Sequence, residues 1–137
     1  MRARPLVAVL ALALVVAAAL ALWPGRPSGE AGMHEIQVIG LYGVMWNGTV
    51  AGATPLDALE AAAGAGGFGI VVTGSGCDAY VRSIGGHEAR GAAGWVFEVG
   101  TSNADGVVWD HPLASAGCVA LGPGQLVRWS WSEGGGY

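Results

Sequence analysis

The chain has 137 residues and a formal net charge of −4, and all six of its basic residues are arginine. Beyond residue 27 only three arginines stand against all ten acidic residues, which gives that part a charge of −7. This balance argues against nucleic acid or an anionic lipid surface as a partner, because both need clustered basic side chains. Roughly 105 residues remain once the apolar N-terminal stretch is set aside, which suits one small domain.

Residues 6–23 are an apolar run without a charge, preceded by Arg2 and Arg4 and followed by Arg26. As a helix the run is about 27 Å long, close to the roughly 30 Å of a bilayer core. The positive-inside rule keeps its N-terminus in the cytoplasm. Two interpretations stay open, an uncleaved transmembrane anchor and a signal peptide cleaved among the small residues at 17–21. Either one predicts export, to the cell surface or to the medium.

These boundaries predict three parts of the chain. Residues 1–23 are the signal peptide or transmembrane anchor, and residues 24–33 (PGRPSGEAGM) are a linker. The proline, glycine and serine content of the linker gives it too little apolar surface to order itself. Residues 34–137 are the exported domain.

The domain is expected to open with a β-hairpin. Ile36 and Val38 alternate with polar residues, as in a strand with one buried face. Asn47-Gly48 is a type I′ turn sequence and predicts the hairpin turn. Asn47-Gly48-Thr49 also matches the N-glycosylation sequon, although the predicted turn accounts for the Asn-Gly pair without it.

One helix follows the hairpin. Thr54 is suited to the N-cap, Pro55 to the first helical position and Asp57 to the first turn, where its carboxylate faces free backbone amides. Leu56 and Leu59 fall on one stripe that can pack against a sheet. The glycine-rich residues 64–67 end the helix.

The rest of the domain reads as strands separated by glycine. Period-two alternation or β-branched runs predict strands at residues 68–73, 80–84, 95–99, 107–109 and 126–131. Trp95 and Phe97 share one face of their strand, and Trp129 is expected in the core. One short helix among several strands predicts an α+β domain.

Cys77 and Cys118 are the only cysteines, and in an exported chain they are expected to form one disulfide. The three histidines, His34, His87 and His111, lie beside predicted turns or termini and lack a metal-binding spacing such as His-Glu-x-x-His. No nucleophile elbow, phosphate-binding loop or carboxylate pair is present. The sequence therefore predicts no metal site and no enzymatic activity.

Four segments, TPLDALEAA, YVRSIGG, GWVFEVG and LGPGQLVRWSW, occur in an order and spacing that resembles the transcobalamin-like C-terminal domain family. The resemblance covers residues 36–131. It implies a β-grasp-like mixed sheet packed on one short helix. One departure is Val99-Gly100, where the family often has Asn-Gly.

The resemblance also implies a ligand. In animal cobalamin carriers the similar domain covers one face of the corrinoid, although a large helical domain that is lacking here forms the other half of the site. The matching contacts would come from Trp95 and Phe97 and from Val119, Ala120 and Leu121. Two functions therefore stay open: a non-catalytic module that binds a small molecule, such as a corrinoid or a glycan, and an interaction module that pairs with an envelope protein. No cofactor is expected beyond a corrinoid as ligand.

Overall fold

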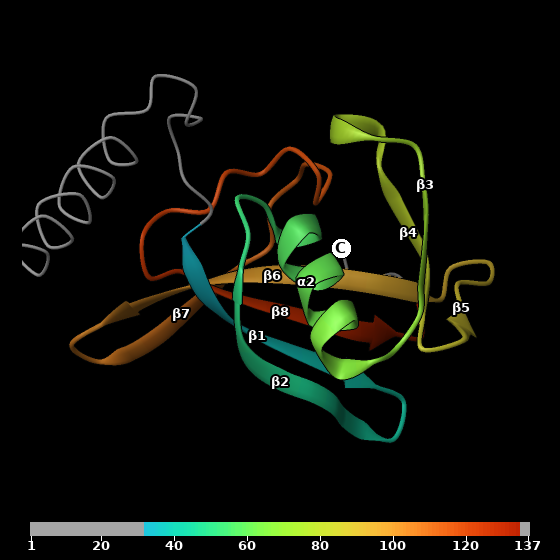
Figure 1. Ribbon diagram of the computed structural model, residues 1–137, viewed down its shortest axis with the longest axis horizontal. Helices are drawn as coiled ribbons and strands as arrows, with labels where there is room; N and C mark the ends of the chain where they lie inside the picture. Colours follow the sequence, from blue (N-terminus) through green and yellow to red (C-terminus); the bar gives the residue numbers. More distant parts are fainter. Residues whose placement is uncertain (1–31, 135–137) are drawn as a thin grey trace, which may run out of the picture. The chain divides into compact units, whose positions relative to one another are not determined.

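The computed structural model describes residues 32–134 (Figure 1). The predicted signal peptide or anchor at residues 1–23 and most of the linker lie outside this range. Among residues 32–134 there is no helix with the length and apolar character needed to cross a membrane. The first strand begins at Met33, so the last residue of the predicted linker belongs to the sheet.

Five strands form the larger sheet, in the spatial order β2-β1-β8-β6-β7. The central pair, β1 and β8, runs parallel, and the other neighbours run antiparallel. The bounds are β1 Met33–Gly40, β2 Gly43–Ala51, β6 Gly94–Asn103, β7 Gly106–Asp110 and β8 Leu126–Ser132.

A second sheet has three antiparallel strands, β3-β4-β5, and a short 3-10 helix precedes its central strand. The helix α2 packs against β2, β1 and β8 of the larger sheet, and β4 contacts β6. Figure 1 shows α2 and the smaller sheet on the same side of the larger sheet. The bounds are α2 Pro55–Gly66, β3 Ile70–Thr73, η1 Gly76–Asp78, β4 Tyr80–Ile84 and β5 His87–Glu88.

The predicted helix is confirmed with its capping residues. The Asp57 backbone N–H donates to the Thr54 hydroxyl over 3.1 Å, and Pro55 occupies the first turn. Gly67 ends the helix in the left-handed conformation, where its N–H bonds to the Ala63 carbonyl. Leu59 is fully buried against the sheet. Local capping and the apolar stripe thus suffice to define this element.

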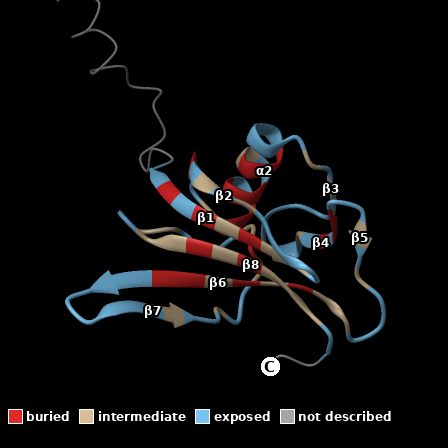
Figure 2. Ribbon diagram, turned by 90° about the horizontal axis from the view of Figure 1, so that it is seen from below, coloured by how far each residue is buried: buried red, intermediate tan, exposed pale blue. Residues whose placement is uncertain are grey.

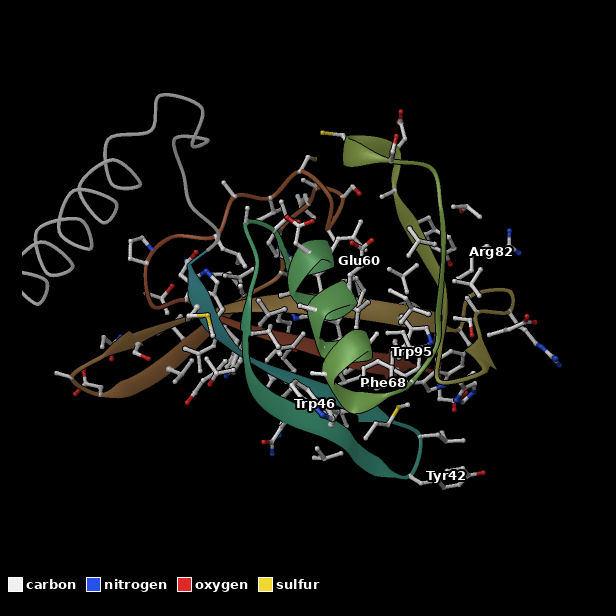
Figure 3. All side chains as sticks on the ribbon, viewed as in Figure 1. Tyr42, Trp46, Glu60, Phe68, Arg82 and Trp95 are labelled. Atoms are coloured by element: carbon white, nitrogen blue, oxygen red, sulfur yellow. The ribbon has the colours of Figure 1, made fainter. Side chains whose placement is uncertain are left out.

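The predicted turn at Asn47-Gly48 is wrong, because both residues lie within β2. The hairpin turns at Leu41 and Tyr42, with Gly40 paired to Gly43. Gly48 is needed for packing, since a Cβ there would lie 2.6 Å from the ring of Trp46. Trp46 lies against the C-terminal end of α2 (Figure 3), so tertiary contacts override the local turn preference.

The predicted α+β class is also wrong, and with it the single β-grasp-like sheet around a helix. Strands make up 50% of the structure and helices 15%, and the strands divide between two sheets. The reason is that only residues 55–66 carry a helical period, whereas period-two alternation extends through most of the remaining chain. The described part is a mostly β domain with one helix. The expected N-terminal hydrophobic helix lies outside the described residues.

The core lies between the larger sheet, α2 and the smaller sheet. Alternate residues of each central strand are buried there, and Figure 2 shows this alternation along β1, β8 and β6. The core side chains include Ile36, Val38, Leu59, Ile84, Val127 and Trp129. Polar or smaller residues between them face the opposite side of the sheet.

Candidate functional site

An apolar cavity of about 210 Å³ lies beside this core, between the two sheets and the start of α2. Leu56 comes from α2, and Ala116 comes from the long segment between β7 and β8. The strands contribute mainly Tyr80, Val81, Trp95, Phe97 and Trp129. Aromatic and aliphatic walls of this kind suit an apolar ligand.

The polar groups of the two tryptophans in the wall are bonded to backbone carbonyls. The Trp95 indole N–H donates to the His87 carbonyl over 2.8 Å, and the Trp129 indole N–H donates to the Pro55 carbonyl over 3.1 Å. Phe97 packs against Trp129 with ring centroids 5.4 Å apart. No buried side-chain N or O atom within residues 32–134 lacks a hydrogen-bond partner. The cavity wall therefore offers shape and apolar surface rather than free polar groups.

Hydrogen bonds to backbone carbonyls hold the 115–121 segment next to the N-terminal end of α2. The Ser115 hydroxyl donates to the Ala79 carbonyl over 2.8 Å and lies 3.3 Å from the Gly76 carbonyl. The Leu56 N–H bonds to the Ala116 carbonyl at 3.0 Å. Ser115 thus joins this segment to the approach to β4, and both segments line the cavity.

The two cysteines flank this junction. Cys77 lies in η1 and Cys118 follows Ala116 by two residues, and their sulfur atoms are 2.6 Å apart without a bond. A disulfide has its sulfurs about 2.0 Å apart, so the pair needs only a small movement to bond. The hydrogen bond with Cys118 raises the pKa of the Cys77 thiol. The disulfide stays a prediction, and it would tie together the two segments that line the cavity.

The ligand residues implied by the resemblance are divided between two places. Trp95 and Phe97 are buried and line the cavity. Val119 and Leu121 are half-buried and pack against the core, and Ala120 is exposed. The Leu121 N–H bonds to the Ala53 carbonyl at 2.9 Å, which places these residues beside the entry to α2 rather than in the cavity wall.

Tyr80, Ala116 and Leu56 also line the cavity, and sequence reasoning did not name them as ligand contacts. Trp129 was expected only as a core residue. No local sequence pattern shows that these residues meet, because they come from separate elements that only the packing of the two sheets brings together.

The histidines take separate structural positions. The buried His34 bonds through Nδ1 to the Gln125 carbonyl at 2.7 Å. His87 stacks on Trp131 with ring centroids 3.9 Å apart, and His111 lies 3.3 Å from Glu98. Among residues 32–134 no three His, Cys, Asp or Glu side chains form a group that could hold a metal ion. The expectation of a domain without a metal stays a prediction.

No protein-family model matches the chain, and no curated protein matches it significantly. The resemblance to the transcobalamin-like C-terminal domain family accordingly stays a prediction.

Proposed function

We propose that the domain is a non-catalytic, exported binding module that holds a small apolar ligand in the cavity between its two sheets. The observation that carries this proposal is the wall formed by Trp95, Phe97 and Trp129 around about 210 Å³. Burial of an apolar ligand there removes its surface from water, at about 25 cal/mol per Å². The indole N–H groups are bonded elsewhere, so the ligand leaves no buried donor unpaired.

The volume of the cavity limits the size of the ligand that it can hold. A cavity of about 150 Å³ holds benzene, and drug-sized ligands need roughly 300–1,000 Å³. The cavity therefore suits a ligand of about one or two small rings. A corrinoid is far larger, so it would have to rest on the outside of the domain, against Val119, Ala120 and Leu121. The smaller apolar ligand is the better supported version of the proposal.

The non-catalytic part of the proposal rests on the positions of the histidines and cysteines. His34, His87 and His111 contact a backbone carbonyl, a tryptophan ring and a carboxylate respectively, and none lines the cavity. The two cysteines are next to each other, which favours a covalent link over a thiol that acts as a nucleophile.

Titration of the ¹⁵N-labelled domain with toluene tests the cavity. The indole N–H resonances of Trp95 and Trp129 are expected to shift in a saturable way, because both rings line the binding space. Ala116→Leu adds three carbon atoms to the cavity wall and is expected to weaken toluene binding at least tenfold. Ala120→Leu is the matched control, since it adds the same atoms to the same segment at an exposed position outside the cavity.

Three results would contradict the proposal: no saturable shift with toluene, equal effects of the two leucine variants, or shifts confined to other tryptophans. Cobinamide and cobalamin are titrated in parallel. If Ala120→Leu weakens corrinoid binding and Ala116→Leu does not, the outer surface at 119–121 is a corrinoid site separate from the cavity.

Export is tested separately on the full-length chain with a reporter enzyme that is active only outside the cytoplasm, fused after residue 137. Activity is expected from the full chain and is expected to be lost when residues 1–23 are deleted. Activity that survives the deletion would contradict export through this segment.

A second candidate function, docking to an envelope protein, is favoured by the tip of the β1–β2 hairpin. Leu41, Val44 and Met45 are exposed there, and Tyr42 is 98% exposed and extends away from the domain (Figure 3). An exposed apolar cluster of this kind is typical of protein contact surfaces. Site-specific crosslinking from position 42 to one envelope protein, combined with no response to toluene or corrinoids, would favour this function over ligand binding.

A further inference from the structure

The other face of the five-stranded sheet is open and carries a different set of side chains. α2 and the smaller sheet pack on the face of the larger sheet that carries the core, and the side chains of the opposite face are outside that core. Ile36 and Val127 point toward the core, so their neighbours Glu35, Gln37 and Leu126 point to this open face.

The strand register aligns these side chains into two rows across the sheet. In the first row Asn47 is opposite Gln37, Gln37 is opposite Arg128, and Arg128 is opposite Glu98. The second row runs beside it. There Leu126 is opposite Gly100 and Gly100 is opposite Trp109, while Glu35 lies on the far side of Leu126.

Gly100 makes room for the Trp109 ring over the sheet. A Cβ at Gly100 would lie 2.9 Å from Cζ3 of Trp109 and 2.8 Å from Val107, so a larger residue would displace the indole. The Arg128 guanidinium lies over the same ring, 4.0 Å from its centroid. A cation at this distance from an indole is attracted by the π electrons. Trp109 is thus fixed from two sides while it remains half-exposed.

Arg128 is itself fixed by Glu98. Its Nε and Nη2 atoms donate to the two carboxylate oxygens of Glu98 over 3.1 Å each, in a bidentate pair. His111 lies 3.3 Å from the same carboxylate. The half-buried pair holds the guanidinium plane against Trp109 and neutralises its charge.

A groove of about 280 Å³ runs over this face next to Trp109. Its walls include the indole of Trp109, the side chain of Leu126, and the polar side chains of Glu35, Gln37 and Asn47. One flat aromatic ring thus borders a space with amide donors and acceptors on its other side. The Glu35 carboxylate is the acidic group in the wall, and the guanidinium of Arg128, which lies over the Trp109 ring, is paired with Glu98.

From these observations we propose that this groove is a second ligand site and that it binds a neutral carbohydrate. A pyranose ring has one apolar C–H face that packs on an indole and a rim of hydroxyl groups that both donate and accept. Amide and carboxylate groups bind neighbouring hydroxyls in pairs. Asn47 and Gln37 are cross-strand partners that both line the groove, so their amides can bind two neighbouring hydroxyls of one sugar. The carbohydrate site does not depend on the apolar cavity, which lies on the other face of the sheet.

The same composition disfavours other ligand classes. An anionic ligand would meet Glu35 without a free cation beside it, because Arg128 is paired with Glu98. An apolar ligand would desolvate the amides of Gln37 and Asn47 without supplying hydrogen bonds in return. A polyhydroxylated neutral ligand can pack its C–H face on the indole of Trp109 and form hydrogen bonds with the amides of Gln37 and Asn47.

Isothermal titration of the domain with hexasaccharides of cellulose, chitin, starch and β-1,3-glucan type tests the proposal. Binding of at least one is expected at micromolar to low millimolar concentration. Trp109→Ala is expected to weaken it at least tenfold, and Gln37→Ala about three- to tenfold. Val108→Ala is the control, because Val108 neighbours Trp109 on β7 but is expected on the opposite face. Its affinity should stay within twofold of the wild type.

A second variant guards against loss of folding in Trp109→Ala. Gly100→Val keeps the indole but displaces it, and it is also expected to weaken saccharide binding at least tenfold, with the far-UV circular dichroism spectrum retained. Failure of all four saccharides to bind would overturn the proposal. Equal binding by the wild type and Trp109→Ala would also overturn it. Sedimentation experiments that show self-association of the domain through this groove would do the same, because a second copy of the domain would then occupy the site. None of these results bears on the toluene titration, so the two sites are tested independently.

Discussion

The substitution Trp129→Phe tests whether the buried indole joins the sheet to the helix. Trp129 is 2% exposed, and its N–H donates to the carbonyl of Pro55 in the first turn of α2 over 3.1 Å. Phenylalanine keeps an aromatic ring in the same place but removes the donor and part of the ring. The Pro55 carbonyl keeps its helical partner, so the substitution removes one of its two hydrogen bonds.

The magnitude follows from these two losses. One buried hydrogen bond contributes about 1 kcal/mol, and the lost ring atoms contribute about 1–2 kcal/mol of burial and packing. The free energy of unfolding is therefore expected to fall by about 2–3 kcal/mol, a large part of the 5–15 kcal/mol typical of small domains. In urea this moves the unfolding midpoint roughly 1–3 M lower, with an unchanged slope.

The assay is urea unfolding of the domain, followed by far-UV circular dichroism. Trp131→Phe is the matched control on the same strand and the same face. Trp131 is half-exposed and its N–H donates to Glu133 at the surface, so its loss should cost under about 1 kcal/mol. Equal midpoints for the two variants would refute the idea that the Trp129–Pro55 bond anchors α2 to the sheet.

Four further predictions concern other parts of the domain. The oxidised protein should show no free thiol at Cys77 or Cys118 by mass spectrometry, and reduction should lower its Tm by roughly 10 °C or more. In the reduced protein the raised pKa of Cys77 means that its thiolate forms at higher pH, so iodoacetamide should alkylate it at lower pH in Cys118→Ala than in the wild type. Gly100→Val should lower the free energy of unfolding by about 1–3 kcal/mol in urea, because Trp109 must move. Tyr42→Ser should change it by less than about 0.5 kcal/mol, since Tyr42 is 98% exposed.

Elements with local signals could be predicted from the sequence. The Thr54 cap, Pro55 and the glycines after the last apolar residue define α2 within its own residues. The alternation at residues 95–99 and 126–131 likewise identified β6 and β8 and the inward face of each strand. The proximity of Cys77 and Cys118 agrees with the pairing expected from their number, although the bond itself stays a prediction.

Features that depend on long-range pairing could not be predicted. The turn sequence Asn47-Gly48 is overridden because Trp46 needs the space above Gly48, next to the end of α2. The division of the strands between two sheets is set by packing and not by any local period. The groove beside Trp109 requires the parallel pairing of β1 with β8, which joins residues about 90 positions apart.

The alternation of β6 and β8 places the two proposed sites on opposite faces of the same strands, and this makes them separable by experiment. Phe97 and Trp129 face the apolar cavity, whereas Glu98 and Arg128, their immediate neighbours, face the open side and hold Trp109. Toluene should therefore shift the indole N–H resonance of Trp129 and leave that of Trp109 in place, and a bound saccharide should do the reverse. A ligand that shifts both resonances equally at low occupancy would mean that the sheet transmits a change between its faces. In that case the two sites would be coupled, and a double variant of Ala116→Leu with Trp109→Ala would depart from additivity.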